Sequence, residues 1–184
     1  KVSQNIEGML QAELADLNMA LAKFKVSFLK EEKVSKNGKD SIEFLIATNV
    51  GQDYKTLTKI ASGGEVSRIM LALKTIFSKV DNIPILIFDE IDIGVGGETV
   101  RKIAGKLKEI GKHAQVICIT HSPQIAAKAT QQFYIEKNVV ANTTVTTVRE
   151  LNQEERVREI GRMLAGENIT DTVLSHALEL LKED

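Results

Sequence analysis

The chain has 184 residues, 43% hydrophobic and 27% charged, with a formal net charge of −1. This is an ordinary soluble composition, and the near-neutral charge without any Lys/Arg block gives no electrostatic support for direct nucleic-acid binding. The single cysteine, Cys118, excludes an internal disulfide framework and a cysteine-based zinc site, and no apolar run approaches the length of a membrane span. The chain starts at Lys1 in a helical pattern, so we expect a piece of something longer.

The first segment predicts an amphipathic helix over about residues 2–21, because apolar side chains recur at helical spacing. They are Ile6, Met9, Leu10, Leu14, Leu17 and Leu21. No good N-cap precedes them, as expected for a truncated longer helix or for one strand of a coiled coil, and a packed N-terminal helix fits at least as well. Residues 1–22 are therefore predicted to be an entry helix or coil end, and residues 23–184 one lobe.

A β-hairpin is predicted next. Residues 23–29 alternate between apolar and polar side chains, and residues 41–48 are apolar and rich in strand-forming residues. Between them Asn37-Gly38 supplies residues that favour positive φ in a turn.

A short polar stretch, Ser62, Gly63, Gly64 and Glu65, then precedes a helix with a clear apolar face. Ser62 and Glu65 have the spacing of a capping box. The two glycines would let a foreign group approach the amides of the first turn, where free N–H groups and the positive dipole end suit a phosphate. An ordinary helix start explains the same residues without a ligand.

The apolar run Ile85–Phe88, after a turn at Asp81-Asn82, predicts a fully buried strand that ends in Asp89 and Glu90. An ionised carboxylate left unpaired in a dry interior costs several kcal/mol. We therefore expect these acids to face a cleft, where a metal, water or ligand can meet them. The alternative is that they only cap the strand.

A glycine-rich loop, a helix from about Glu98 to Ile110 and a second buried strand, residues 115–120, follow. Strand–helix–strand with a helix-length crossover implies parallel neighbours. Asp89, Glu90 and the next polar residue, His121, should therefore emerge at one sheet edge. A histidine beside two strand-end carboxylates is a candidate for chemistry.

The last third predicts a short helix over residues 123–129, two strands (133–136 and 143–151) around a polar turn at 138–142, and two helices. Asn152 with Glu155 is a predicted cap for the first of these helices. His113 and His176 are assigned to the surface or to packing.

The order of four motifs resembles the head of ABC-type ATPases. Ser62–Glu65 resembles the signature motif, Ile85–Glu90 the Walker B strand, Asp92-Ile93-Gly94 the D-loop and Thr120-His121 the switch-histidine region. Glu at position 65, where transporters carry Gln, is similar to the branch of structural-maintenance-of-chromosomes (SMC) proteins.

The finer resemblance is to the RecN family of bacterial recombination and repair ATPases. It covers nearly the whole chain and is carried by residues 60–74, 88–92, 120–126 and the tail from Glu154 onward. Gly96 and Ser122 depart from the common residues, without touching a position assigned to chemistry. The sequence contains no Gly-x-x-x-x-Gly-Lys-Ser/Thr phosphate loop. The resemblance therefore implies the C-terminal half of a head, an α/β lobe with a mostly parallel sheet flanked by helices, an antiparallel hairpin and a C-terminal helical pair.

The same resemblance implies a role for each site residue. Asp89 would help hold Mg²⁺, through water; Glu90 would orient and deprotonate the attacking water; His121 would contact the γ-phosphate. The signature residues would reach ATP held by a second head, and Asp92 and Gly94 would lie at the seam between the heads.

The implied function is ATP hydrolysis, with ATP and Mg²⁺ as cofactors, that drives DNA double-strand break repair and recombination. The implied partners are the N-terminal half of the same head, a second head in an ATP-dependent homodimer, and DNA through the full-length protein, in the cytoplasm at the nucleoid and not at a membrane. We expect this chain alone to be inactive. Two alternatives stay open: a non-hydrolysing docking lobe, and the nucleotide-binding half of another ABC ATPase such as a transporter.

Overall fold

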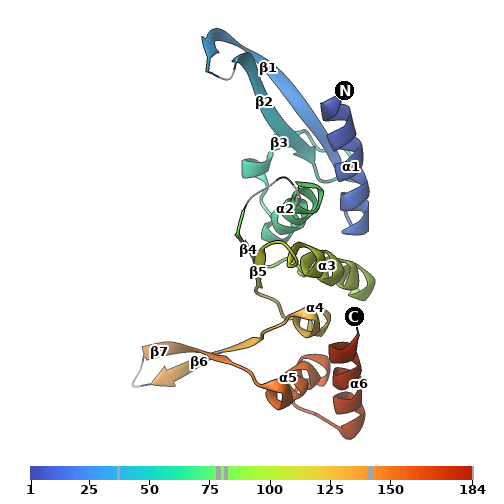
Figure 1. Ribbon diagram of the computed structural model, residues 1–184, viewed down its shortest axis with the longest axis vertical. Helices are drawn as coiled ribbons and strands as arrows, with labels where there is room; N and C mark the ends of the chain where they lie inside the picture. The colour runs from blue at the N-terminus through green and yellow to red at the C-terminus, as the bar shows by residue number, and fades with distance from the viewer. Residues whose placement is uncertain (37, 78–79, 81–82, 141–142, 184) are drawn as a thin grey trace. The chain divides into compact units, whose positions relative to one another are not determined.

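The computed structural model describes residues 1–36, 38–77, 80, 83–140 and 143–183. The chain forms two compact units, Lys1–Ile119 and Thr120–Asp184, and the described strands form three separate sheets (Figure 1). Asn37, Asp81 and Asn82 of the predicted turns, and residues 141–142 of a third, lie outside the described residues.

The N-terminal helix α1 (Val2–Asp16) is shorter than predicted. Asn18 takes a left-handed conformation with φ 58°, and the Met19 N–H donates to the carbonyl of Leu14 at 2.9 Å. The Asn18 N–H donates to Ala15 O at 3.3 Å, which completes the Schellman arrangement that ends a helix. The apolar pattern continues past this point, but the backbone has already turned, and α1 packs on α2 and β1.

The predicted hairpin is confirmed. Strands β1 (Lys23–Ser35) and β2 (Gly38–Ala47) pair antiparallel, and β3 (Lys55–Thr56) adds to β2 before the short 3-10 helix η1 (Leu57–Lys59). The rings of Phe24 and Phe44 lie 5.4 Å apart across the hairpin. Strand β1 is longer than expected, because Lys30 and Ser35 still pair with Asp40 and Gly38, with a register shift between them.

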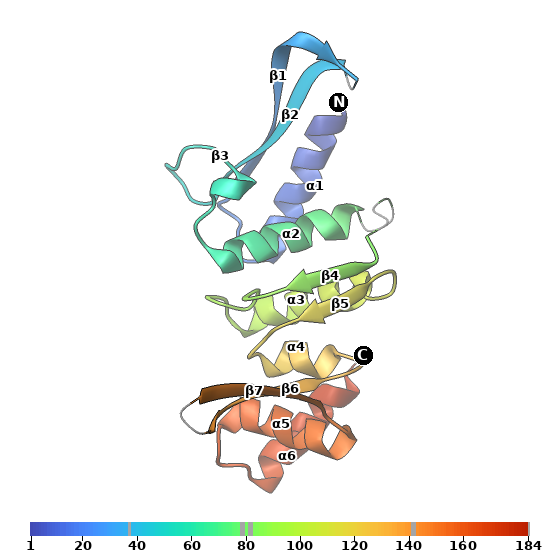
Figure 2. The ribbon, with the colours of Figure 1, turned by 90° about the vertical axis from the view of Figure 1, so that its left-hand side faces the viewer.

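The strand–helix–strand unit is also confirmed. Helix α2 (Gly63–Phe77) leads to β4 (Ile85–Phe88), and α3 (Gly97–Ile110) crosses over to β5 (Gln115–Cys118). Strands β4 and β5 run parallel, with Phe88 opposite Cys118, and α2 packs against α3 (Figure 2). The carboxyl ends of both strands therefore lie at one edge of this sheet.

The prediction that β4 is buried on both faces is wrong for this chain. Phe88 is buried, but Ile85 is 50% and Ile87 68% exposed, and Ile117 on β5 and Ile119 just after it are 44% and 50% exposed. Helix α3 covers one side of the β4–β5 pair, so side chains that alternate to the other side face solvent (Figure 1). An apolar run in the sequence alone cannot distinguish a strand that is covered on both faces from a strand that is covered on one face.

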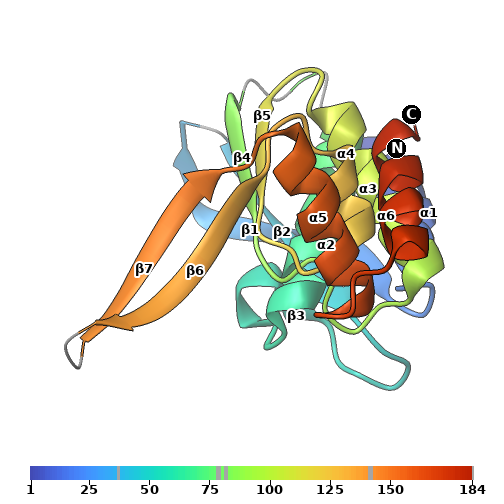
Figure 3. The same ribbon diagram turned by 90° about the horizontal axis from the view of Figure 1, so that it is seen from below.

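The second unit is a small helical cluster with a hairpin. It contains α4 (Pro123–Lys128), β6 (Phe133–Val140), β7 (Thr143–Glu150), α5 (Gln153–Ala165) and α6 (Asp171–Lys182). Its core joins Ala126 and Ala127 to Ile160, Ala177 and Leu180, while the hairpin extends away from α5 and α6 (Figure 3). The predicted helical pair is confirmed.

The cap predicted for α5 is confirmed as a full capping box. Asn152 Oδ1 accepts the Glu155 N–H at 3.0 Å, and the Glu155 carboxylate accepts the Asn152 N–H at 2.9 Å. None of the helices in the described ranges combines the length with the apolar character that spanning a bilayer requires.

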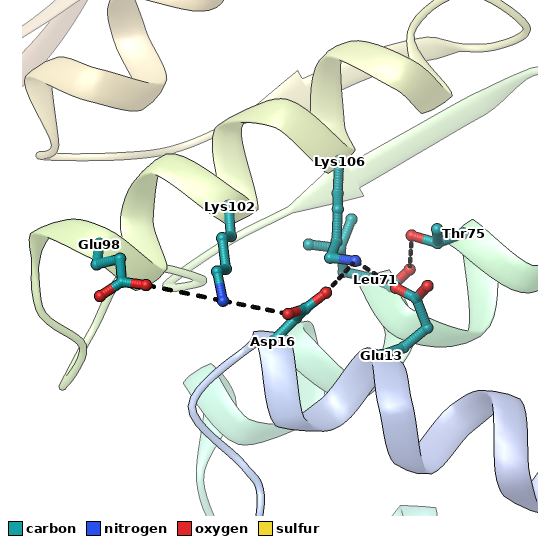
Figure 4. Close-up of polar contacts among 7 residues, drawn as sticks. All are labelled: Glu13, Asp16, Leu71, Thr75, Glu98, Lys102 and Lys106. Carbon is teal, nitrogen blue, oxygen red and sulfur yellow. Dashed lines mark hydrogen bonds and ion pairs between the residues drawn. The ribbon is translucent and has the colours of Figure 1, made fainter.

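A charged network fastens α1 to α3 (Figure 4). Lys102 Nζ lies 3.2 Å from Asp16 Oδ1 and 3.8 Å from Glu98 Oε1, and Lys106 Nζ contacts both Glu13 and Asp16. The hydrogen bond from Lys102 holds the pKa of Asp16 below its ordinary value near 3.8; slight burial opposes this, and the charge of Lys106 adds to it. The folded state therefore favours the ionised carboxylate.

We expect this network to make a pH-dependent contribution to the free energy of unfolding. Because the pKa of Asp16 is lower in the folded chain, its contribution is present above about pH 3.8 and is lost as pH falls through the folded value. We expect Asp16→Asn to lower the free energy of unfolding at neutral pH by less than about 1 kcal/mol, since exposed pairs contribute little. The difference from the parent chain should vanish in acid.

Urea unfolding at a series of pH values measures this difference, with Asp53→Asn as the matched control at another exposed aspartate. A difference for Asp16→Asn that stays constant from pH 7 to below pH 3 would contradict the assignment.

Candidate functional site

The four signature residues sit at the start of α2, as predicted. Ser62 Oγ accepts the Glu65 N–H at 3.4 Å, and Ser62 O accepts the Val66 N–H at 3.0 Å. Ser62 and Gly63 are exposed, so this helix start is open to solvent on one side. A helix N-terminus of this kind presents N–H groups and the positive end of the helix dipole.

The two strand-end acids are exposed, and the backbone at one of them is strained. Asp89 and Glu90 follow β4, and Glu90 has φ 58°, a left-handed conformation that is uncommon for residues other than glycine. Ile91 is fully buried directly after it. Strain of this kind persists only where the surroundings fix the backbone, and it is concentrated at functional sites.

The D-loop residues lie just beyond this turn. Asp92 is buried, with 4% of its surface exposed, whereas Gly94 is exposed and has φ 75°. Glycine adopts such a conformation without the penalty that a side chain would add. The loop therefore reverses direction directly after the acids.

Glu90 lies against the signature glycines of the same chain. A Cβ added at Gly63 would come within 2.5 Å of Glu90 Oε2, and a Cβ at Gly64 within 2.9 Å of the Glu90 carbonyl oxygen. Both values are far inside ordinary van der Waals contact, so the glycines provide the room for this approach. The structure thus brings the signature motif and the proposed base together in one unit.

Sequence reasoning missed two residues that make this approach possible. Ser67 Oγ donates to Asp89 O at 2.6 Å, and Arg68 Nη1 donates to Ile93 O at 2.9 Å and Ile91 O at 3.4 Å. No local sequence pattern signals these contacts, because the accepting carbonyls lie 22 to 25 positions away along the chain.

The acids make the carboxyl edge of the β4–β5 pair negative. Burial, together with the charges of Asp92 and Asp89, raises the pKa of the Cys118 thiol to about 12. The thiol therefore stays protonated near neutral pH and is no nucleophile there. Within the described residues, no group of three or more His, Cys, Asp or Glu side chains could by itself hold a metal ion.

His121 belongs to the second unit. Its side chain is exposed. Strands β4 and β5 run parallel as the prediction required, but the meeting of His121 with Asp89 and Glu90 stays a prediction.

Comparisons with known proteins agree on the family. The model described as "RecF/RecN/SMC N terminal domain" matches residues 11–144. A protein named DNA repair protein RecN from Halalkalibacterium halodurans is 43% identical over 98% of this chain, and one from Bacillus subtilis is 47% identical over 82%. The chain covers 33% and 26% of these relatives, about a third or less of their length.

Among solved structures, the Smc head domain with coiled coil and joint from Pyrococcus yayanosii is 22% identical, with a TM-score of 0.55 over 85% of this chain and 28% of that chain. This likeness confirms the predicted α/β head fold. Among the described strands, parallel pairing is confined to β4 and β5, and the other two sheets are antiparallel. The family match includes the signature stretch, the strand-end acids and the D-loop, and the chain belongs to the RecF/RecN/SMC family.

Proposed function

We propose that this chain is the C-terminal lobe of an SMC-like ATPase head, which hydrolyses ATP between two heads and thereby drives DNA double-strand break repair and recombination. Family membership and the name of the relatives, DNA repair protein RecN, support this proposal. The observation that carries it is the strained turn that holds Glu90 against Gly63 and Gly64.

In this proposal Glu90 is the general base. Its carboxylate is exposed at the end of β4, where it can reach a water molecule, and general-base assistance is worth roughly 10²–10⁴-fold. Asp89 would hold Mg²⁺ through water, which suits an ion that keeps several waters and takes few carboxylates. When bound, Mg²⁺ would neutralise charge on the phosphates. His121 would contact the γ-phosphate.

The signature residues would serve the ATP of a second head. Ser62, Gly63 and Glu65 lie at an open helix start, which can accept a phosphate from outside the lobe. Gly94, exposed on the D-loop, would lie at the seam between heads, and buried Asp92 would support that loop from within. In this arrangement ATP joins the heads and hydrolysis releases them.

The open isoleucine face supports a composite head. Ile85, Ile87, Ile117 and Ile119 form an apolar surface beside the carboxyl edge of the strands, where a partner lobe with the phosphate loop would pack. Contiguous exposed apolar surface of this kind marks a site of association. The entry helix α1 would then be the returning end of a coiled coil.

The first prediction of the proposed function concerns Glu90. In the full-length protein, or in this lobe mixed with its upstream half, Glu90→Gln should lower the kcat for ATP by about 10²-fold or more, because the base is lost while the shape is kept. Phosphate release under saturating ATP and Mg²⁺ measures this.

Glu43→Gln, at an exposed glutamate on β2, is the control and should be neutral. Normal turnover by Glu90→Gln would refute Glu90 as the base. No turnover even by the unaltered, well-formed complex would favour the docking-lobe alternative.

The second prediction separates the two signature glycines. Gly64→Ala should cost about 1–3 kcal/mol of unfolding free energy, because its Cβ would lie 2.9 Å from the backbone oxygen of Glu90 and something in the main chain must move. Gly63→Ala meets only the flexible end of the Glu90 side chain, so it should fold normally but turn over ATP more slowly. Urea unfolding and ATPase assays of both variants test this order, and equal stability of the two variants would contradict it.

The third prediction concerns the isoleucine face. Ile87→Arg should prevent co-purification of this lobe with its upstream half, because a charge would be buried in an apolar contact. Val34→Arg, at an apolar residue on β1 that is 70% exposed, is the matched control. Undiminished assembly with Ile87→Arg would show that this face is not the contact.

A further inference from the structure

Side chains on the second turn of α2 form hydrogen bonds with the backbone that follows β4. Three carbonyls of this segment, those of Asp89, Ile91 and Ile93, accept hydrogen bonds from Ser67 or Arg68. Neither side chain belongs to a motif that the proposed function uses, and both act on residues 22 to 25 positions away in the sequence. The bonds are therefore tertiary contacts between the helix and the turn that carries Glu90.

Arg68 is an energetically unfavourable residue at this position, because its charged side chain is buried. It is 7% exposed, and its Nε is buried without a hydrogen-bond partner in the described part of the chain. Burial lowers the pKa of the guanidinium, and the charge of Glu65, one turn earlier, raises it only in part. Its bonded partners are neutral carbonyls, which cannot balance a full charge. A buried cation contributes little net stability in such surroundings, so specificity of structure is the better explanation.

The segment that these bonds hold is the strained one. Glu90 has φ 58°, and the Ile93 N–H donates to Glu90 O at 3.2 Å, which closes the turn. Ser67 bonds the carbonyl just before Glu90, and Arg68 bonds two carbonyls after it. The left-handed residue is thus clamped from both sides, which is the condition under which such a conformation persists.

We propose that Ser67 and Arg68 are positioning residues, which fix the turn at Glu90 and so aim its carboxylate. This inference rests on the proposed function, in which Glu90 is the base. Ser62 precedes the first turn of the same helix and Glu65 lies in it, so the helix start that would meet a second head's ATP and the hydrogen bonds that hold the turn at Glu90 belong to the same helix. A base must lie within hydrogen-bond reach of the proton that it takes, so a small displacement of this turn is costly.

The test uses the full-length protein with Arg68→Met, which keeps the length of the side chain and removes its donors. We expect kcat for ATP to fall about tenfold or more, because misplacement of a catalytic group by about 1 Å can cost this much. KM for ATP should stay within about twofold, because neither residue contacts the nucleotide. Ser67→Ala should lower kcat less, and Ser67→Thr, which keeps the hydroxyl, should restore it.

Two further measurements separate positioning from general stability. Amide hydrogen exchange should become faster at residues 90–94 in Arg68→Met, while the rest of α2 keeps its protection. In the Glu90→Gln background, Arg68→Met should cause no additional loss, because the group that it positions is already gone. Arg101→Met, the same substitution at an exposed arginine on α3, is the control and should leave both readouts unchanged.

The outcomes distinguish the two proposals. If the unaltered protein turns over ATP but Arg68→Met and Ser67→Ala keep normal kcat and normal exchange, the positioning role is wrong and the ATPase stands. If the unaltered protein does not hydrolyse ATP, the proposed function fails, and the exchange of residues 90–94 still decides whether the clamp exists. If Arg68→Met does not fold, Ser67→Ala and Ser67→Thr decide the matter.

Discussion

A contact through backbone carbonyls joins helix α2 to the turn after β4, and the site residues of the first unit take their positions from it. A helix packed only by apolar side chains could slide against the strand by a fraction of a turn. The hydroxyl of Ser67 and the guanidinium of Arg68 remove that freedom, because hydrogen bonds have narrow limits of distance and angle. Gly63 and Gly64 then let the acid approach the helix start. Through this one contact, motifs that are separated in the sequence lie close together in space.

The second constraint is that each unit leaves large apolar side chains of its strands exposed. In the first unit the isoleucines of β4 and β5 face solvent on one side. In the second unit the β6–β7 hairpin exposes Phe133 and Ile135, which are 55% and 52% exposed. Two-stranded sheets are marginal in water without a packed face. The apolar content of these strands is therefore greater than each unit buries by itself, which fits the proposed covering by another lobe.

The sequence predicted most elements, and which elements carry the candidate site residues, for identifiable reasons. Helical periodicity located α2 and α3, and the Asn152–Glu155 spacing located the start of α5. The predictions that failed depended on information that local patterns lack. Asn18 ended α1 inside a continuing apolar pattern, and the exposure of Ile87 depends on what lies above the sheet. The roles of Ser67 and Arg68 are set by carbonyls far away in sequence, which no helical pattern reports.

Departures from the usual residue and backbone preferences are concentrated around the turn at Glu90. A cation is buried on an apolar helix face, a glutamate takes a left-handed conformation, and two glycines open a helix that alanine would stabilise better. Each of these departures alone lowers the free energy of unfolding, and a strand–helix–strand unit can fold without any of them. Each is explained by one requirement, that Glu90 be held close to the start of α2. Sequences selected only for folding avoid such conflicts, and conflicts that share one structural purpose are what the proposed role of Glu90 requires.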